Sequence, residues 1–439
     1  MPPAVLFRAD VVCPMAGPPL ADGGVLVVGD RVAAVGPAAD LRGQADREHH
    51  VTGVLLPGLV NAHAHLEYTD AASLAQPGPF HLWVRALIGM TSQWAEERWG
   101  RSAHRGVLSS LRAGTTTLFD VVPRGPAVPA AARAGLTGDS FVEVVMVDDH
   151  HADSVLQQVV QALALPAEGR RVGIAPHAPY TLGTQVLRRL AALARRSAAP
   201  LHVHLAETQS EVAAVRDGAG PFADRARELG MAFEWLDGTG LSPVRYADAA
   251  GALYPGASVA HGVWVDMLEA RLLAERGVTV VCCPRSNTLL QAGDAPLERY
   301  AQAGTALALG TDSAASAPDL DVLAEAAAWA ALARRREMAV WPSRSGPVEL
   351  AEQAVRLATV DGAAAMGWGA SAGVLASGRR ADMVGVALQT TPAAVYRDLL
   401  ERGAGRQVLT VLGGVRKARR DDPDQPWPDL DDDAWRARP

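Results

Sequence analysis

The chain has 439 residues, of which 49% are hydrophobic and 20% are charged, the balance of an ordinary globular enzyme. A net charge of −7 gives no basic footprint, so nucleic acid is not an expected partner. Three cysteines are too few for a disulfide framework, and the sequence shows neither a signal-peptide pattern nor an apolar run long enough for a bilayer, so we expect a cytoplasmic protein without a membrane partner.

In chain order, residues 1–53 show short strands and turns, with a hairpin pattern around Gly29 and Asp30. From Val54 onward the pattern changes to alternating strands and helices. Apolar segments predict eight strands, over Val54–Ala62, Thr116–Val122, Phe141–Asp148, Arg171–Pro176, Pro200–Leu205, Ser258–Val263, Val278–Pro284 and Thr305–Gly310. Helices are predicted between them, over Arg101–Ala113, Val128–Ala134, Ser154–Leu163, Thr184–Ala198, Gln209–Asp217, Asp266–Arg276 and Leu297–Ala303.

This alternation predicts an α/β fold. Strands that alternate with helices pair in parallel through crossover connections, and eight such units close a (β/α)8 TIM barrel. The rival is an open, doubly wound sheet, which usually has fewer strands and often a glycine-rich phosphate turn. The first strand–helix unit contains no G-x-G-x-x-G sequence, so the barrel is favoured.

Strand character returns near the C-terminus. Two alanine-rich helices are predicted over Asp319–Ala339 and Pro347–Met366, and strand patterns follow in residues 373–387 and 407–415. Because both ends of the chain differ from its middle in the same way, we predict that they form one β domain. The predicted division is a discontinuous β domain of residues 1–53 and 370–418, a barrel of residues 54–369, and an irregular tail of residues 419–439 packed through Trp427 and Trp435.

Histidines gather at the predicted strand ends. His63 and His65 lie two residues apart after the first strand, so their side chains point to the same side. The fourth, fifth, sixth and eighth strands end near His177, His202 and His204, His261, and Asp312. Functional residues of TIM barrels lie at the C-terminal ends of the strands, so this concentration indicates a metal site.

Three histidines and one carboxylate suit Zn²⁺, or less often Fe²⁺ or Mn²⁺. The predicted ligands of one divalent ion per chain are His63, His65, His204 and Asp312. His202 competes with His204, and the alternative is a buried histidine inside the barrel. Three other side chains are expected at the same mouth: Glu207 as a carboxylate that moves protons, His261 as a partner of the water, and His177 as a substrate contact or a structural turn residue.

The chain resembles the amidohydrolase superfamily, in its branch of aminopurine deaminases and chlorohydrolases. The motifs that carry the resemblance span the chain: Pro57–His65, Ala113–Thr116, His204–Thr208, Ala260–Gly262, Cys283–Asn287, Gly310–Ser313 and Gly378–Val384. The resemblance implies a distorted (β/α)8 barrel with a flanking small β-sandwich built from both termini. Many binuclear members bridge two metals through a lysine of the fourth strand. The one lysine here, Lys417, lies far from that strand, so the site should be mononuclear.

A divalent metal lowers the pKa of water to about 7 and so supplies hydroxide at neutral pH. We expect Asp312 to accept the proton of that water and Glu207 to protonate the ring nitrogen beside the attacked carbon. His261 would orient or help deprotonate the nucleophile. Attack on an amidine carbon followed by loss of ammonia makes the predicted reaction a hydrolytic deamination.

The substrate is expected to be read by the segment after the first strand. Phe80 and Trp83 are suited to stack on a flat heteroaromatic ring, and the alternative is packing within a lid helix; Glu67, with Tyr68, is placed to bind a sugar or polar tail. The His63–Glu67 and Pro79–Val84 segments are most similar to aminodeoxyfutalosine deaminases of menaquinone biosynthesis. That similarity implies the substrate 6-aminodeoxyfutalosine, whose carboxylate would pair with one of three arginines, Arg85, Arg124 or Arg285.

Other readings remain open at this level. A triazine-type chlorohydrolase, a guanine deaminase or an adenosine-type deaminase would share the ligands and differ in the pocket. A dipeptidase fits less well, because Glu207 follows a metal histidine by three residues and the bridging lysine is absent. A non-catalytic scaffold barrel would have lost ligands. A homodimer is an assembly compatible with the sequence.

Overall fold

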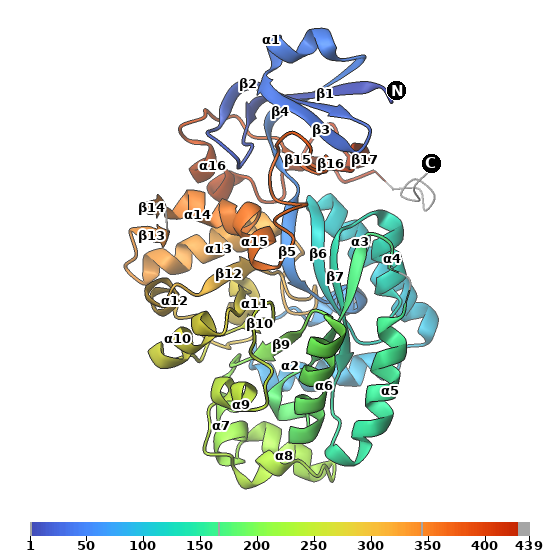
Figure 1. The fold of residues 1–439 in the computed structure, drawn as a ribbon, viewed down its shortest axis with the longest axis vertical. Coiled ribbons are helices and arrows are strands. Elements are labelled where there is room, and N and C mark those ends of the chain that lie inside the picture. Colours follow the sequence, from blue (N-terminus) through green and yellow to red (C-terminus); the bar gives the residue numbers. More distant parts are fainter. Residues whose placement is uncertain (1, 166, 344–345, 429–439) are drawn as a thin grey trace.

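The computed structural model describes residues 2–165, 167–343 and 346–428, with a β-rich unit above a larger barrel (Figure 1). Barrel strands supply two parallel four-stranded sheets, β5-β6-β7-β8 and β9-β10-β11-β12. Their bounds are β5 (Leu59–Ala64), β6 (Thr115–Val122), β7 (Gly138–Val144), β8 (Arg170–Pro176), β9 (His202–Leu205), β10 (Ser258–His261), β11 (Thr279–Cys282) and β12 (Ala306–Leu309). Bridges between Ala64 and Asp312 and between Ile174 and Leu201 join the sheets at both seams, so the fold is TIM-barrel-like.

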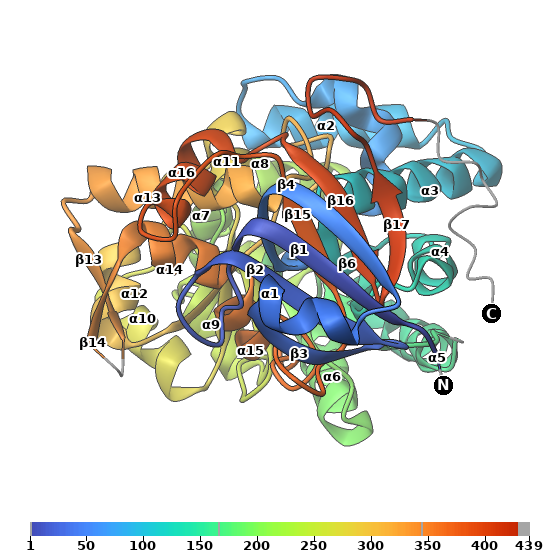
Figure 2. The same cartoon turned by 90° about the horizontal axis from the view of Figure 1, so that it is seen from above.

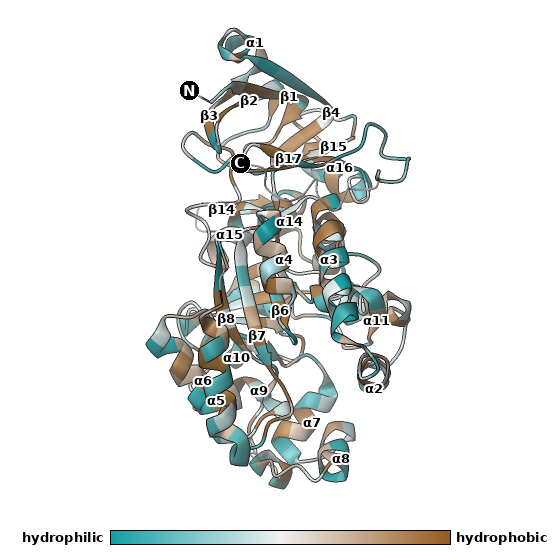
Figure 3. Cartoon of the chain, turned by 90° about the vertical axis from the view of Figure 1, so that its right-hand side faces the viewer, coloured by the Kyte–Doolittle hydropathy of each residue, from teal (hydrophilic) through white to brown (hydrophobic). Residues whose placement is uncertain are grey.

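Helices surround the strands and alternate hydrophilic and hydrophobic bands (Figure 3). In α6 the buried residues Val186, Leu187, Leu190, Ala191 and Ala194 recur every three or four positions and form one face. The helices that cover or cap the barrel are α2 (Phe80–Thr91), α3 (Glu96–Arg112), α4 (Ala127–Ala134), α5 (Ala152–Leu163), α6 (Thr184–Ser197), α7 (Gln209–Asp217), α8 (Pro221–Glu228), α9 (Pro243–Ala249), α10 (Met267–Glu275), α11 (Pro284–Leu289), α12 (Leu297–Ala303), α13 (Val322–Arg335), α14 (Leu350–Leu357) and α15 (Val360–Ala365). Within the described residues, no helix is long and apolar enough to cross a membrane.

A seven-stranded sheet contains strands from both ends of the chain, which lie side by side above the barrel (Figure 2). Its order is β17-β16-β15-β4-β1-β2-β3. The bounds are β1 (Ala4–Val12), β2 (Leu20–Val28), β3 (Arg31–Pro37), β4 (Arg47–Pro57), β15 (Met383–Val386), β16 (Gln407–Leu412) and β17 (Val415–Arg419), with α1 (Ala38–Leu41) and α16 (Val395–Arg402) beside them. These strands are linked in one continuous sheet, so the predicted two-layer sandwich is not confirmed, and the predicted domain boundaries stay predictions.

The sheet passes directly into the barrel at Gly58, between β4 and β5. A Cβ atom at Gly58 would lie 2.1 Å from Oγ1 of Thr116, so only glycine fits between the two layers. The predicted first barrel strand was therefore too long at its start, because Val54–Pro57 pairs with β15 in the terminal sheet. The chain turns at Gly58 and enters the barrel at Leu59.

Strands over the eight predicted segments are confirmed, and one helical prediction needs correction. The single helix predicted over Pro347–Met366 is wrong, because β14 (Gly346–Glu349) precedes α14 and the backbone leaves helical geometry at Thr359. β14 pairs with β13 (Val340–Ser343) in a hairpin that lacks a strong alternating pattern. In the tail, Trp427 packs against an apolar cluster beside α3 and α4, whereas Trp435 lies outside the described residues.

Candidate active site

Residues two apart on a strand share a face, so the inward-pointing side chains of the barrel form layers, and the last layer lies at the mouth. Phe141 of β7 belongs to the core inside the barrel, and its ring stacks on His202 of β9 with centroids 5.0 Å apart. One layer nearer the mouth, the same faces present Glu143 and His204. His65, two residues beyond His63 on β5, joins that upper layer and stacks on His204 at 5.2 Å.

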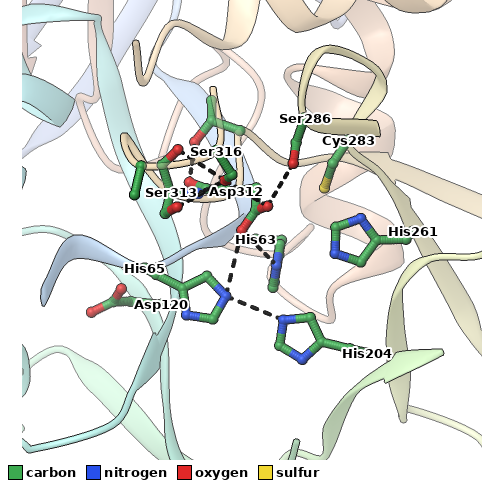
Figure 4. A network of polar contacts seen from close by, with 12 residues as sticks. His63, His65, Asp120, His204, His261, Cys283, Ser286, Asp312, Ser313 and Ser316 are labelled. Atoms are coloured by element: carbon green, nitrogen blue, oxygen red, sulfur yellow. Dashed lines mark hydrogen bonds and ion pairs between the residues drawn. The ribbon is translucent and has the colours of Figure 1, made fainter. Parts of the chain in front are cut away.

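The nitrogen and oxygen atoms of the four predicted ligands converge (Figure 4). Nε2 of His65 lies 3.2 Å from Nε2 of His204, and Oδ1 of Asp312 lies 3.5 Å from Nε2 of both His63 and His65. Ligand atoms at zinc–nitrogen distances around a tetrahedral ion lie roughly 3.3 Å apart. The described residues therefore fit a four-coordinate divalent metal. His63, His204 and His261 form a second converging triplet at the same place.

Hydrogen bonds from below fix which nitrogen of His63 faces the mouth. Ser258 donates its hydroxyl to the carbonyl of Leu201, so its Oγ accepts from Nδ1 of His202 at 2.7 Å. Nε2 of His202 then accepts from Nδ1 of His63 at 2.8 Å. Nε2 of His63 is left with a free lone pair and is buried without a hydrogen-bond partner among the described residues. This arrangement favours His204 over His202 as the ligand and gives His202 a supporting place.

Two other rings are oriented in the same way. Nδ1 of His204 donates to the carbonyl oxygen of His177 at 3.0 Å, and Nδ1 of His261 bonds Oδ1 of Asn287 at 2.9 Å. Burial lowers the pKa of His261 to about 4, and burial, aided by His63, lowers the pKa of His65 to about 3. Neutral imidazoles offer the lone pairs that a metal requires.

Asp312 is kept ionised by its neighbours. Burial acts to raise the pKa of Asp312, but the neighbouring rings of His63, His65 and His261 outweigh burial and hold this pKa well below its usual range. Ser286 and Ser316 each donate a hydroxyl to Oδ2 at 2.7 Å, which leaves Oδ1 toward the histidines. Gly310 lets this segment approach β5, because a Cβ atom there would lie 2.5 Å from Cβ of His63.

Backbone strain marks the same place. His261 and Asp312 have positive φ angles of 72° and 59°, and Ala206, which precedes Glu207, has a φ of 52°. Such conformations cost side-chain-bearing residues of order 1–3 kcal/mol and persist where the surroundings enforce them. At the turn after β9, the carboxylate of Glu211 stabilises the strained backbone, because it accepts hydrogen bonds from the amide N–H groups of Ala206 at 2.9 Å and Glu207 at 2.7 Å.

Glu207 lies beside His261, with Oε1 3.6 Å from Nε2. Burial raises the pKa of Glu207 well above its usual value, and the charges of Asp312 and Glu211 add to the rise. A raised pKa favours the protonated form of a carboxyl group, which is the form that can deliver a proton to a reacting atom. The arrangement sets Asp312, whose pKa is lowered, against Glu207, whose pKa is raised, across one cluster of histidines.

An aromatic row leads from the lid helix α2 to His177. Phe80 packs on Trp83, with centroids 5.6 Å apart, and meets the ring of Phe222 edge-on; Phe222 stacks on Tyr180 at 4.3 Å. Nε1 of Trp83 donates to the carbonyl of Ala315 at 2.7 Å and fastens α2 over the segment that follows Asp312. The predicted stacking of Phe80 and Trp83 on a substrate ring remains a prediction, as does the substrate contact of His177.

The geometry does not support the predicted substrate contact of Glu67. Its carboxylate is fully buried and accepts backbone N–H groups of Arg124, Gly125 and Ala127 at 2.8–3.0 Å, which anchors the loop after β6. The chain enters η2 (Leu66–Leu74) directly after His65, and this turn carries Glu67 away from the mouth. Arg285 is engaged as well, because Glu325 and Asp319 bind its guanidinium.

Sequence reasoning missed several residues of this cluster. Ser286 lies in the short helix α11 and Ser316 in the segment after β12, and neither stands out in the sequence; Glu211 shows the pattern of an ordinary helix. Glu143 lies on β7 beside His177 and His204, and one ligand atom from each of the three lies within 4.8 Å of the others. Burial raises the pKa of Glu143 to about 8, and Glu67 and Asp312 contribute. The sequence did contain one indication: Glu143 lies two residues after Phe141, so both side chains of this strand point into the barrel.

A barrel with a histidine-rich mouth of this kind defines a metal-dependent hydrolase, and comparison with known proteins agrees. A sequence model of the Amidohydrolase family matches residues 54–414, and the chain belongs to this family. It is an enzyme that hydrolyses carbon–nitrogen bonds.

Individual relatives cover most of the chain. The 5-methylthioadenosine/S-adenosylhomocysteine deaminase of Moorella thermoacetica is 32% identical over 431 residues, which cover 94% of each chain. The aminodeoxyfutalosine deaminase of Deinococcus radiodurans is 32% identical over 333 residues, 73% of this chain and 78% of that protein. The structure of an adenosine deaminase from Xanthomonas campestris with bound zinc superposes with a TM-score of 0.78 at 26% identity and covers 99% of this chain and 96% of that chain.

Proposed function

We propose that the enzyme hydrolytically deaminates an aminopurine nucleoside and releases ammonia. One observation carries the proposal: the buried carboxyl group of Glu207, which is not needed as a ligand, lies 3.6 Å from His261 beside four converging metal-ligand atoms. The ion, zinc by preference, would be held by His63, His65, His204 and Asp312 and would supply an activated water.

The protein's own groups divide the remaining work. Glu207 is suited to protonate the ring nitrogen next to the carbon that bears the amino group, which makes that carbon more electrophilic. Asp312, ionised and held by two serines, is suited to accept a proton from the attacking water. His261, fixed by Asn287, orients the nucleophile from the side of β10. The proton from Asp312 or Glu207 then leaves with ammonia.

Within this class, we propose 6-aminodeoxyfutalosine as the first substrate to test, as in menaquinone biosynthesis. The Deinococcus radiodurans relative carries that name, and the segment Pro79–Val84 supports the proposal. Of the three arginines, we propose Arg124 for a carboxylated tail, because it is exposed in the loop after β6 whereas Arg285 is bound by Glu325 and Asp319. The Moorella thermoacetica relative makes 5′-methylthioadenosine and S-adenosylhomocysteine the second pair to test.

The test is ammonia release by zinc-loaded protein from adenosine, guanine and the three nucleosides above, with chloride release from atrazine as the test of the chlorohydrolase alternative. Glu207→Gln keeps the shape of the side chain and removes the transferable proton, so kcat on the best substrate should fall by about 10²–10⁴-fold. Glu275→Gln, an exposed change at the end of α10, is the matched control. Unchanged turnover in E207Q would refute the mechanism, and two metal ions per chain would refute the mononuclear site.

A further inference from the structure

Glu143 is a partly buried carboxyl group that the proposed reaction does not use. It points into the barrel because it is two residues beyond Phe141, whose ring lies in the interior core. It comes one residue before the end of β7, in register with Ala175 of β8. The backbone N–H of His177 bonds the carbonyl of Val144, so the ends of the two strands stay together at the mouth.

Glu143 has no hydrogen bond or ion pair with any residue in the part of the chain that the structure describes. His177 is its neighbour, and Nδ1 of that ring is occupied by the hydroxyl of Thr181 at 3.1 Å, which leaves Nε2 toward the mouth. A carboxyl group at the mouth that no protein donor binds is free to accept hydrogen bonds, so its position suits donors that arrive with a ligand.

The position of Glu143 limits what those donors can be. One ligand atom of Glu143 lies within 4.8 Å of one of His204, a proposed metal ligand. A cationic ligand group this close to a divalent ion would be repelled by it. Neutral hydroxyl groups meet no such penalty, and a pair of them on adjacent carbons matches the two oxygens of a carboxylate.

The order of strands around the barrel places Glu143 where a sugar would lie. Glu207 and His261 come from the ends of β9 and β10, whereas Glu143 and His177 come from β7 and β8. A purine that presents its amino-bearing carbon to the ligands and its adjacent nitrogen to Glu207 must direct its sugar away from that flank. The sugar would therefore lie toward β7 and β8.

We infer that Glu143, beside His177, forms a subsite that binds the vicinal hydroxyl groups of the substrate's ribose. This inference rests on the proposed deamination of a nucleoside. It assigns to Glu143 and His177 the recognition that distinguishes a ribonucleoside from a free base or a deoxynucleoside.

The test compares adenosine with 2′,3′-dideoxyadenosine, which lacks both hydroxyl groups, using the parent, Glu143→Ala, Glu143→Gln and the control Glu275→Gln, all zinc-loaded. The parent and control should prefer adenosine by roughly 10–100-fold in kcat/KM, as expected for two lost hydrogen bonds. E143A should lose that factor on adenosine and change less than about threefold on the dideoxynucleoside, so that the preference disappears. E143Q, which keeps one acceptor oxygen, should retain part of the preference and decides the matter if E143A does not fold.

Other outcomes separate the inference from the function on which it rests. Equal losses on both nucleosides in E143A, or an undiminished preference for adenosine, would overturn the subsite while deamination stands. Loss of bound zinc from E143A, measured by metal analysis, would make Glu143 a ligand and overturn the subsite too. A parent enzyme that releases ammonia from none of the nucleosides would refute the proposed function, and the subsite with it.

Discussion

Removing the hydroxyl of Ser286 should weaken metal binding without unfolding the protein. Ser286 lies in α11, and its hydroxyl donates to Oδ2 of Asp312 at 2.7 Å, a bond that keeps Oδ1 turned toward the histidines. A hydrogen bond to a charged group contributes about 1.5–3 kcal/mol. Ser316 donates to the same oxygen at 2.7 Å and retains part of the orientation, so the lower half of that range applies. Ser286→Ala should therefore lower zinc affinity by about 10-fold, within the 10–100-fold typical of residues behind metal ligands.

The assay is competition for zinc with a chromogenic chelator of known affinity, read as the chelator concentration that removes half of the metal. Ser154→Ala is the matched control, because Ser154 is exposed in α5 and its hydroxyl bonds only the nearby carbonyl of His151. With excess zinc, S286A should melt at the temperature of the parent. A half-removal point that moves by less than about threefold would refute the reasoning that Ser286 orients Asp312 for the metal.

Two further predictions concern the lid and the terminal sheet. Trp83→Phe keeps an aromatic ring and removes the N–H that donates to the carbonyl of Ala315. The loss of a hydrogen bond of about 1 kcal/mol should raise KM about fivefold and leave kcat little changed. An unchanged KM would show that this bond does not hold α2 in place. Burial raises the pKa of Asp382 to about 6, so the folded state binds the proton of this carboxyl group more tightly than the unfolded state does. The resulting contribution to the free energy of unfolding is complete below about pH 4 and is lost as the pH rises through 6. Asp382→Asn should gain up to about 3 kcal/mol relative to the parent between pH 4 and 7 in urea unfolding, and a difference that stays constant with pH would contradict this.

The sequence predicted the parts of this site that depend on strand periodicity. His63 and His65, like His202 and His204, are spaced by two residues, so their common face and their position at strand ends followed without coordinates. The eight barrel strands were visible for the same reason, since their apolar runs are bounded by helical patterns.

What the sequence could not predict depends on contacts between segments that lie far apart along the chain. Nothing local shows that Ser286 and Ser316 meet on one oxygen of Asp312. Glu67 was misplaced because the chain leaves strand geometry immediately after His65, and a spacing argument that continues the strand then fails. Glu143 was overlooked because one acidic residue in an apolar strand carries no motif, although its alternation with Phe141 was present in the sequence.

The sheet shared by the two termini has a consequence for synthesis. β4 cannot pair with β15 until the barrel between them has left the ribosome, because Val54 and Val386 are neighbours in the sheet and almost the whole barrel separates them along the chain. β4 also continues through Gly58 into the strand that carries His63 and His65. The N-terminal strands therefore wait, unpaired on one edge, while the barrel forms. Completion of the terminal sheet therefore depends on segments translated after the barrel, and a chain truncated before residue 383 would leave Val54–Pro57, which leads into the first barrel strand, without its partner β15.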